Sequence, residues 1–277
     1  RVPRFGRDLR ADSTDRIVKA LAVLARERPV LRLFVEVWSE NQEDRRRVAE
    51  ACRRHGFQRS SSPRSYVRTI WMDLRPSEKE ILASFHATGR RHIRAPGKKG
   101  YQVQSIEDPA AAPAVDAIFQ DTFARTGGAP PAVDWAWVIQ LNGSPDAPLR
   151  LVGLYPEDAS DSSDPVSFAM ALLHGEVAEY AHAGSVRDRS LRIPLLYAPT
   201  WELMRWARSR GARYWDFGGV TGGSADDDDP MGGISDFKRY FSTALDTVGE
   251  EWILRPRPLQ DTIARSVSRW LRRGARF

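Results

Sequence analysis

The chain carries the run Tyr214-Trp215-Asp216-Phe217-Gly218-Gly219-Val220 near its C-terminal end. Aromatic residues fill the first half of this run, as is typical of a β-strand, and two glycines close it. Because glycine has no side chain, a turn at the end of such a strand leaves the backbone open to close approach by a substrate. The run therefore predicts a strand whose C-terminal end forms the floor of a binding site.

A second run, Asp236-Phe237-Lys238-Arg239-Tyr240-Phe241, follows after an acidic loop, and Val248-Gly249-Glu250 comes next. Phe237 and Phe241 are separated by one helical turn, so they place Lys238 beside two apolar anchors. A lysine in an aromatic helix also commonly lays its stem on apolar surface and keeps its ammonium in water. The spacing alone leaves both interpretations of Lys238 open.

A third segment is rich in arginine. Ala183-Gly184-Ser185 ends a predicted strand, and the segment continues through Arg187, Arg189 and Arg192 to Tyr197. Guanidinium groups clustered in a loop between a strand and a helix can hold a diphosphate. Three solvated surface arginines would give the same pattern, so this loop also has two interpretations.

The rest of the chain alternates helical and strand periodicity, which indicates an α/β (α+β) fold. Predicted helices lie at about residues 14–28, 43–55, 77–94, 112–123, 133–140 and 195–210. Predicted strands lie at about residues 31–37, 66–73, 101–106, 149–155, 166–173, 177–182 and 214–219. Ser13 or Thr14 is expected to cap the first helix, Ser77-Glu78-Lys79-Glu80 is a capping box, and Gly211 suits a left-handed C-cap.

Composition bounds the class of protein. The 277 residues are 42% hydrophobic, which suffices for one large or two modest domains. No apolar run reaches the length of a membrane span, and the charged stretch 1–10 lacks the apolar segment of a signal peptide. We therefore expect a cytoplasmic protein, and we expect it to be a monomer.

The motifs of common cofactor sites are missing. The sequence has no G-x-x-x-x-G-K-[ST] loop and no G-x-G-x-x-G after a strand, which argues against ATP hydrolysis and NAD chemistry. The single Cys52 allows no disulfide and is expected to be buried and inert. The five histidines lack metal-binding spacing, and Asp226 to Asp229 are expected to form a solvated loop. We expect no metal and no cofactor.

The chain is basic. Its formal net charge is +6 and its isoelectric point is near 9.7, with the excess carried mostly by arginine. Arginine favours bidentate contacts with phosphate, which suggests an anionic partner, although a basic protein without such a partner is equally compatible with these numbers.

The last segment predicts an amphipathic basic helix. Its apolar stripe is Leu259, Ile263, Val267 and Leu271, and the opposite face carries Arg265, Arg269, Arg272 and Arg273. Such a helix packs against the body of its protein or contacts a membrane surface or a nucleic acid.

These motifs, in this order, resemble the FemABX family of peptidoglycan bridge-forming aminoacyltransferases, in particular its short FemX-like members without a coiled-coil arm. Five blocks between about residues 66 and 256 carry the resemblance. They are Thr69 to Leu74, residues 90–94 with 98–100, Tyr180 to Ser185 with Arg192, residues 210–220, and Phe237-Lys238 with Gly249-Glu250.

The resemblance implies two GNAT-like acyltransferase domains, the second inserted in the first. The first would comprise residues 1–75 and 247–277 and be N-terminally incomplete, and the second would comprise residues 76–246. Family members transfer an amino acid from aminoacyl-tRNA to an amino group of the stem peptide of UDP-MurNAc-pentapeptide or of its lipid-linked form. The implied function is therefore tRNA-dependent aminoacyl transfer in cell-wall cross-bridge formation, with peripheral contact at the inner membrane surface as a further expectation.

The resemblance also assigns site residues. The family's characteristic lysine falls on Lys238, where it would stabilise the oxyanion of acyl transfer or hold the terminal phosphate of the tRNA. A phosphate-contacting arginine falls on Arg192. Glu36 lies roughly where the family has an acidic residue and is the candidate general base, unless the substrate or water accepts the proton. The other candidate substrate-binding residues are Arg189, Tyr197, Phe237, Asp216, Gly218 and Gly219.

Two departures from the family leave the acceptor open. Residues 193–196 are more apolar than usual, and the early strands of the first domain, with a nucleotide-diphosphate contact, have no counterpart. One alternative is an acyl-CoA-dependent N-acyltransferase acting on polysaccharide or a small amine, although the pyrophosphate loop [RQ]-x-x-G-x-[GA] is not found. The other alternative is a non-catalytic protein that binds nucleic acid or a membrane surface.

Overall fold

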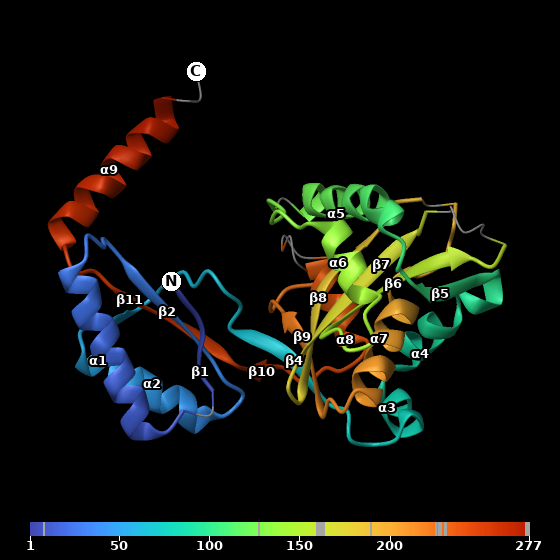
Figure 1. Ribbon diagram of the computed structural model, residues 1–277, viewed down its shortest axis with the longest axis horizontal. Coiled ribbons are helices and arrows are strands. Elements are labelled where there is room, and N and C mark those ends of the chain that lie inside the picture. Colours follow the sequence, from blue (N-terminus) through green and yellow to red (C-terminus); the bar gives the residue numbers. More distant parts are fainter. Residues whose placement is uncertain are drawn as a thin grey trace. The chain divides into compact units, whose positions relative to one another are not determined.

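The computed structural model describes residues 1–7, 9–126, 128–158, 164–188, 190–224, 226, 229 and 232–274 (Figure 1). The chain divides into two compact units, the first made of Arg1–Arg68 with Asp246–Phe277 and the second of Thr69–Leu245. The unit boundary and the expected boundary after residue 75 differ by one strand, because that strand pairs with the sheet of the second unit.

The first unit is a small sheet with two helices. Its sheet has the order β1-β2-β11-β3, in which β1 is parallel to β2 and the other neighbours are antiparallel. Its elements are β1 (Val2–Gly6), α1 (Ala11–Glu27), β2 (Leu33–Trp38), α2 (Gln42–Arg54), β3 (Gln58–Arg59), β10 (Asp246–Thr247), β11 (Gly249–Leu254) and α9 (Pro258–Gly274).

The core of the first unit forms between the sheet and helices α1 and α2. Val35 and Val37 of β2 pack with Val18 of α1 and with Val48 and Cys52 of α2. Cys52 is fully buried, as expected, and burial raises the pKa of its thiol to about 12, which keeps it a thiol at neutral pH.

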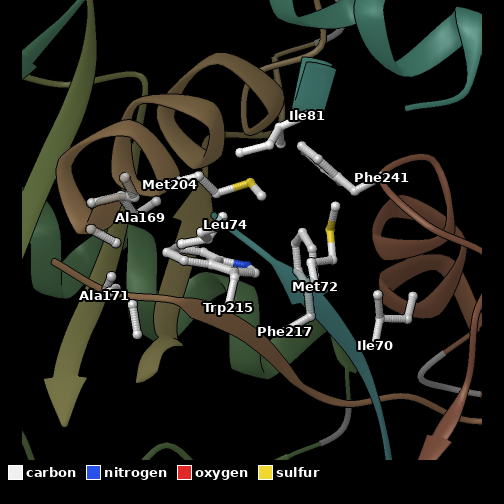
Figure 2. Packing of buried hydrophobic residues seen from close by; sticks show 14 of the residues in the cluster. Ile70, Met72, Leu74, Ile81, Ala169, Ala171, Met204, Trp215, Phe217 and Phe241 are labelled. Carbon is white, nitrogen blue, oxygen red and sulfur yellow. The ribbon is translucent and has the colours of Figure 1, made fainter. Parts of the chain in front are cut away.

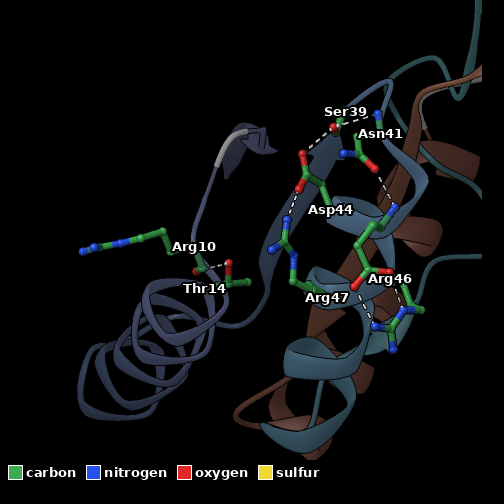
Figure 3. A network of polar contacts seen from close by, with 8 residues as sticks. Arg10, Thr14, Ser39, Asn41, Asp44, Arg46 and Arg47 are labelled. Carbon is green, nitrogen blue, oxygen red and sulfur yellow. Dashed lines mark hydrogen bonds and ion pairs between the residues drawn. The ribbon is translucent and has the colours of Figure 1, made fainter.

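The entries into α1 and α2 differ in how they are capped (Figure 3). The side chain of Asn41 caps α2 by accepting a hydrogen bond from Glu43 N at 2.8 Å. The predicted cap of α1 at Ser13 or Thr14 is wrong, because α1 begins one turn earlier and Thr14 is a buried helical residue whose hydroxyl donates to Arg10 O. Strand β1 was not expected either, since its five residues include Pro3 and the charged Arg4.

The second unit is a larger twisted sheet with helices on its faces. Within this unit the strand order is β4-β9-β8-β7-β6-β5, with β8 parallel to β9 and every other pair antiparallel. Its elements are β4 (Arg68–Asp73), α3 (Glu78–Ser84), α4 (Ala87–Arg94), η1 (Gly97–Lys99), β5 (Tyr101–Ser105), η2 (Pro109–Ala111), α5 (Ala112–Thr126), α6 (Trp135–Asn142), β6 (Leu149–Pro156), β7 (Ser167–His174), β8 (Val177–Ser185), α7 (Tyr197–Ser209), β9 (Tyr214–Gly219) and α8 (Gly232–Arg239).

Helix α7 connects the two parallel strands β8 and β9 and covers one part of the core (Figure 2). Met204 of α7 packs over Trp215 and Phe217 of β9, and Phe241 closes the cluster after α8. Two local predictions are confirmed: Ser77 and Glu80 form the capping box of α3, and Gly211 follows α7 with a φ of +87°. The α/β class expected from the sequence is confirmed.

None of the helices in the described part of the chain is long and apolar enough to cross a membrane.

Candidate active site

Strand β9 ends in a turn that is held by its own carboxylate. Gly218 has a φ of +69°, a left-handed conformation that favours glycine. Asp216 is fully buried and accepts a hydrogen bond from Gly218 N at 2.8 Å. The hydroxyl of Thr69, from β4, donates to the same carboxylate and lies 2.9 Å from Gly218 O. Asp216 therefore holds the Gly218 turn through hydrogen bonds made inside the protein.

Helix α8 is attached to this strand end by three side chains. Lys238 Nζ donates to Gly219 O at 2.7 Å. Arg239 donates to Thr221 O at 2.7 Å and to Gly223 O at 2.8 Å. Ser235, which is buried, accepts a hydrogen bond from Thr221 N at 3.0 Å. The strand end and the helix thus form one hydrogen-bonded assembly.

Lys238 is a buried cation. It is 6% exposed, and within the described residues it makes no ion pair and has Gly219 O as its one hydrogen-bond acceptor. Burial lowers the pKa of Lys238 to about 8, and the nearby carboxylate of Asp216 opposes this shift. The ammonium is therefore mostly charged at neutral pH, and two of its three protons take no part in the hydrogen bond to Gly219 O.

Aromatic rings surround the helix that carries Lys238. The Phe237 ring lies 4.8 Å from that of Tyr197, edge to face, and 6.2 Å from that of Tyr180. Tyr197 stacks on Phe241 at 5.6 Å. Burial raises the pKa of Tyr197, so its hydroxyl stays protonated at neutral pH. The structure thus brings together Lys238, Phe237, Tyr197 and the residues of the β9 turn.

The arginine loop leads into α7, the helix that begins at Tyr197. Arg192 is exposed, has a φ of +46°, and lies five residues before Tyr197 at the start of α7. A left-handed conformation is uncommon for arginine and marks a backbone held by its surroundings. Arg189 lies outside the described residues.

Glu36 belongs to the first unit. It lies in β2, is 4% exposed and faces Glu251 across the antiparallel pair with β11. Arg1 donates to Glu36 at 2.6 Å, and Arg64 bonds Glu251 at 3.0 Å and lies 3.8 Å from Glu36. The candidate general base is therefore an ion-paired carboxylate.

Three further residues shape the strand end and were not expected from the sequence, namely Thr69, Ser235 and Arg239. Thr69 lies 147 positions from Asp216 in the chain, so no local pattern could connect them. Arg239 had a signal, because it follows Lys238 one residue later on a short helix. Among the described residues, no group of three or more His, Cys, Asp or Glu side chains is arranged to hold a metal ion.

Comparisons with known proteins agree with this architecture. The family described as acetyltransferase (GNAT) domain matches residues 83–239, which include β9 and Lys238. The crystal structure of FemX superposes with a TM-score of 0.72 at 14% identity, over 91% of this chain and 79% of that chain. The predicted FemX-like GNAT fold is thereby confirmed.

Two further solved structures have lower similarity. L-PGS from Bacillus licheniformis gives a TM-score of 0.56 at 12% identity, over 92% of this chain and 78% of its own. The C-terminal domain of a putative lysylphosphatidylglycerol synthetase from Agrobacterium fabrum gives 0.57 at 10% identity, over 93% and 77%. No curated protein matches the chain by sequence.

Proposed function

The chain belongs to the acetyltransferase (GNAT) domain family, and from this premise we propose that it is a tRNA-dependent aminoacyltransferase that acylates an amino group of a peptidoglycan precursor. Acyl transfer is the activity that the fold supplies. The observation that carries the proposal is the buried ammonium of Lys238, held at the glycine turn of β9 by Gly219 O. This is a fixed positive charge beside the half-buried Gly219 at the end of the strand.

The reaction needs little more than such a charge. The acceptor amine attacks the ester carbonyl of the aminoacyl-tRNA, the C–N bond forms, and the carbonyl oxygen becomes an oxyanion. The oxyanion then collapses, the bond to the terminal ribose breaks, and the ribose oxygen leaves with a proton from the amine. Lys238 would stabilise the oxyanion, an interaction that exists only near the transition state.

The donor is proposed from two facts. FemX and L-PGS are among the structures that this fold resembles, and the acyl-CoA pyrophosphate loop is absent from the sequence. The other candidate residues receive proposed roles in the same scheme. Phe237 and Tyr197 would line the acyl channel, the turn at Gly218 and Gly219 would form its floor, and Asp216 would hold that turn. Arg189 and Arg192 would contact phosphate.

The first unit would serve the acceptor. We propose that both units are GNAT-like domains, the second inserted in the first, and that Glu36 is the general base that takes the proton from the amine before the ribose oxygen receives it. Helix α9 exposes an apolar stripe in which Leu259 is 81%, Ile263 64% and Val267 51% exposed. A basic helix with this stripe suits the surface of an anionic membrane, which would place the enzyme near a lipid-linked acceptor.

The test is a transfer assay with radiolabelled aminoacyl-tRNA, offered with UDP-MurNAc-pentapeptide, with its lipid-linked form, and with phosphatidylglycerol vesicles. Label in the precursor supports the proposal. Label in phosphatidylglycerol would show instead that the acceptor is a lipid and not a peptidoglycan precursor. Transfer from acyl-CoA, with no transfer from any charged tRNA, would contradict the proposal that aminoacyl-tRNA is the donor.

Flotation with anionic vesicles tests the proposed membrane contact of α9. The double variant Leu259→Ser with Ile263→Ser should no longer float with the vesicles, and unchanged flotation would contradict the membrane role.

A further inference from the structure

The surface of α4 and η1 carries cations that have no local partner. Arg91, Arg94, Lys98 and Lys99, hereafter the α4 basic strip, are all exposed. Within the described residues, none of the four makes an ion pair or a side-chain hydrogen bond. The neighbouring Arg90 differs, since it donates to Ala83 O and Phe85 O and fastens α4 to α3.

Several other surface cations are matched by carboxylates. In the second unit Arg75 pairs with Asp73, Arg205 with Glu78 and Glu202, and Arg213 with Glu176. The α4 basic strip differs from these pairs because it places four cations, unpaired among the described residues, within residues 91–99, which concentrates positive charge on one surface.

Stabilisation of the helix accounts for only part of this concentration of charge. Cations near a helix C-terminus interact favourably with its dipole, which would explain Arg91 and Arg94 in the last turn of α4. Lys98 and Lys99 lie beyond that helix, in η1, where the dipole of α4 gives no reason for them. His92 adds no charge to the strip, because burial lowers its pKa and Arg91 lowers it further.

The strip is rigidly joined to the helix that carries Lys238. His86 N, at the start of α4, donates to Tyr240 O at 3.0 Å. Gly89 packs so closely on the same carbonyl that a Cβ there would lie 2.6 Å from it. The His92 ring meets that of Tyr197 at 4.7 Å. Tyr240 is two residues beyond Lys238, so a ligand bound to α4 would lie near the end of α8.

The four cations are distributed along the strip and do not converge on one point. Arg91 and Lys99 are eight positions apart, which at about 1.5 Å per helical residue spreads the strip over roughly 12 Å. A nucleic-acid duplex carries about one negative charge per 1.7 Å of its axis, so several phosphates fall within that length. A small anion would engage one end only.

The surroundings favour RNA over a membrane as the partner. None of the exposed large hydrophobic side chains in the described part of the chain lies between Leu31 and Trp137, so α4 and η1 have nothing to insert into a bilayer. That is the reverse of α9, where the apolar stripe is the main feature.

We propose that the α4 basic strip binds the phosphate backbone of the acceptor stem of tRNA and thereby leads its 3′ end to Lys238. This inference rests on the proposed function for the identity of the RNA, and the strip's binding of duplex RNA can be measured without it.

The experiment compares three proteins for binding of a fluorescent hairpin RNA with an acceptor-stem sequence and a single-stranded 3′ end. They are the unaltered protein, a strip variant (Arg91→Gln, Arg94→Gln, Lys98→Gln, Lys99→Gln), and a control with the same loss of charge from other exposed positions (Arg10→Gln, Lys19→Gln, Arg28→Gln, Lys79→Gln). All eight side chains are exposed, so both variants should fold, and far-UV circular dichroism checks this.

Each lost phosphate contact should lower the slope of log affinity against log salt by about 0.9. Between 50 and 200 mM salt, four contacts correspond to roughly a 100-fold difference in how far affinity falls. We expect the strip variant to lose this dependence and the control to keep most of it. Equal slopes for the two variants would overturn the inference, as would loss of anionic-vesicle binding by the strip variant with RNA binding intact.

The same proteins are then assayed for transfer. If the unaltered protein transfers from charged tRNA and the strip variant has an unchanged KM for it, the inference fails and the proposed function stands. If no charged tRNA is a donor while the strip still controls hairpin binding, the proposed function fails and the RNA surface stands.

Discussion

The two units treat buried charge in opposite ways. Among the described residues of the first unit, the four buried carboxylates all have arginine partners: Asp44 with Arg47, Glu36 with Arg1 and Arg64, Glu251 with Arg64, and Asp261 with Arg32 and Arg255. In the second unit the buried Lys238 has a backbone carbonyl as its acceptor and no ion pair among the described residues.

This difference separates charge that supports a fold from charge kept for a ligand. A buried ion is costly unless it is paired, and the arginines of the first unit reduce that cost. Lys238 makes no ion pair among the described residues, and the nearby carboxylate of Asp216 offsets its burial only in part, so its lowered pKa expresses the remaining cost. A charged group held in an unfavourable state at a strand end is a candidate for catalysis, because a substrate can supply the missing negative charge.

The largest expected effect comes from Lys238→Met. Removing one donor to an oxyanion typically lowers the rate of acyl transfer about 10² to 10³-fold, and we expect a loss of this size. The free energy of unfolding should stay the same or rise at neutral pH, because the burial penalty disappears together with one hydrogen bond. Single-turnover transfer and urea unfolding measure the two quantities.

Lys79→Met, on exposed α3, is the matched control and should change neither quantity. Retained transfer in Lys238→Met would remove the catalytic role and leave Lys238 as a structural cation. If Lys238→Met lowers the free energy of unfolding by several kcal/mol, Lys238 supports the fold, as the paired charges of the first unit do.

The next effect is on stability. Arg64→Ala removes the cation that bonds Glu251 at 3.0 Å and leaves a nearly fully buried carboxylate uncompensated. Removing one partner of such a pair should lower the free energy of unfolding by about 3 kcal/mol. Combining it with Glu251→Gln should restore part of the loss, since the stranded charge is gone.

Arg46→Ala serves as its control, because Arg46 pairs with Glu43 and Glu50 on the solvent face of α2. An exposed pair of this kind is worth less than about 1 kcal/mol. If the two arginine variants unfold alike, the arginines of the first unit do not compensate its buried carboxylates, and the contrast with Lys238 loses its basis.

Local patterns predicted much of the fold and one end of the site. The capping box at Ser77 and the C-cap at Gly211 depend on neighbours within a few residues, and both were predictable. The side of α1 that faces the core was less so. Ile17 and Leu24 gave the apolar spacing, yet they are 37% and 49% exposed, and the core contains Val18 instead. The face of α1 that packs on the core is therefore the one next to the predicted face.

The chemistry of the site was only half visible in the sequence. Lys238 could be singled out from its aromatic neighbours, but its burial depends on the end of β9, and its pKa follows from that burial. Thr69 meets Asp216 through the pairing of β4 with β9, which brings together segments far apart in the chain. Arginine pairing in the first unit likewise needs the fold, since Arg64 and Glu251 are 187 positions apart.

The smallest effect tests the same contrast through pH. The pKa of Lys238 falls from an ordinary 10.5 to about 8, so the unfolded chain binds more protons than the folded one between pH 8 and 10.5. Its burial penalty is complete below pH 8 and is relieved as pH rises through this window. Stability of the unaltered protein relative to Lys238→Met should therefore rise from pH 8 to 10, as followed by urea unfolding.

Activity should change in the opposite direction. Above pH 8 the ammonium is lost, so transfer that depends on it should fall about tenfold between pH 7 and 9 relative to Lys238→Arg, whose guanidinium stays charged. Taking this ratio cancels the rising reactivity of the acceptor amine. A ratio that stays flat while relative stability still rises would mean that Lys238 titrates as the burial predicts but is not the charge that the transition state needs.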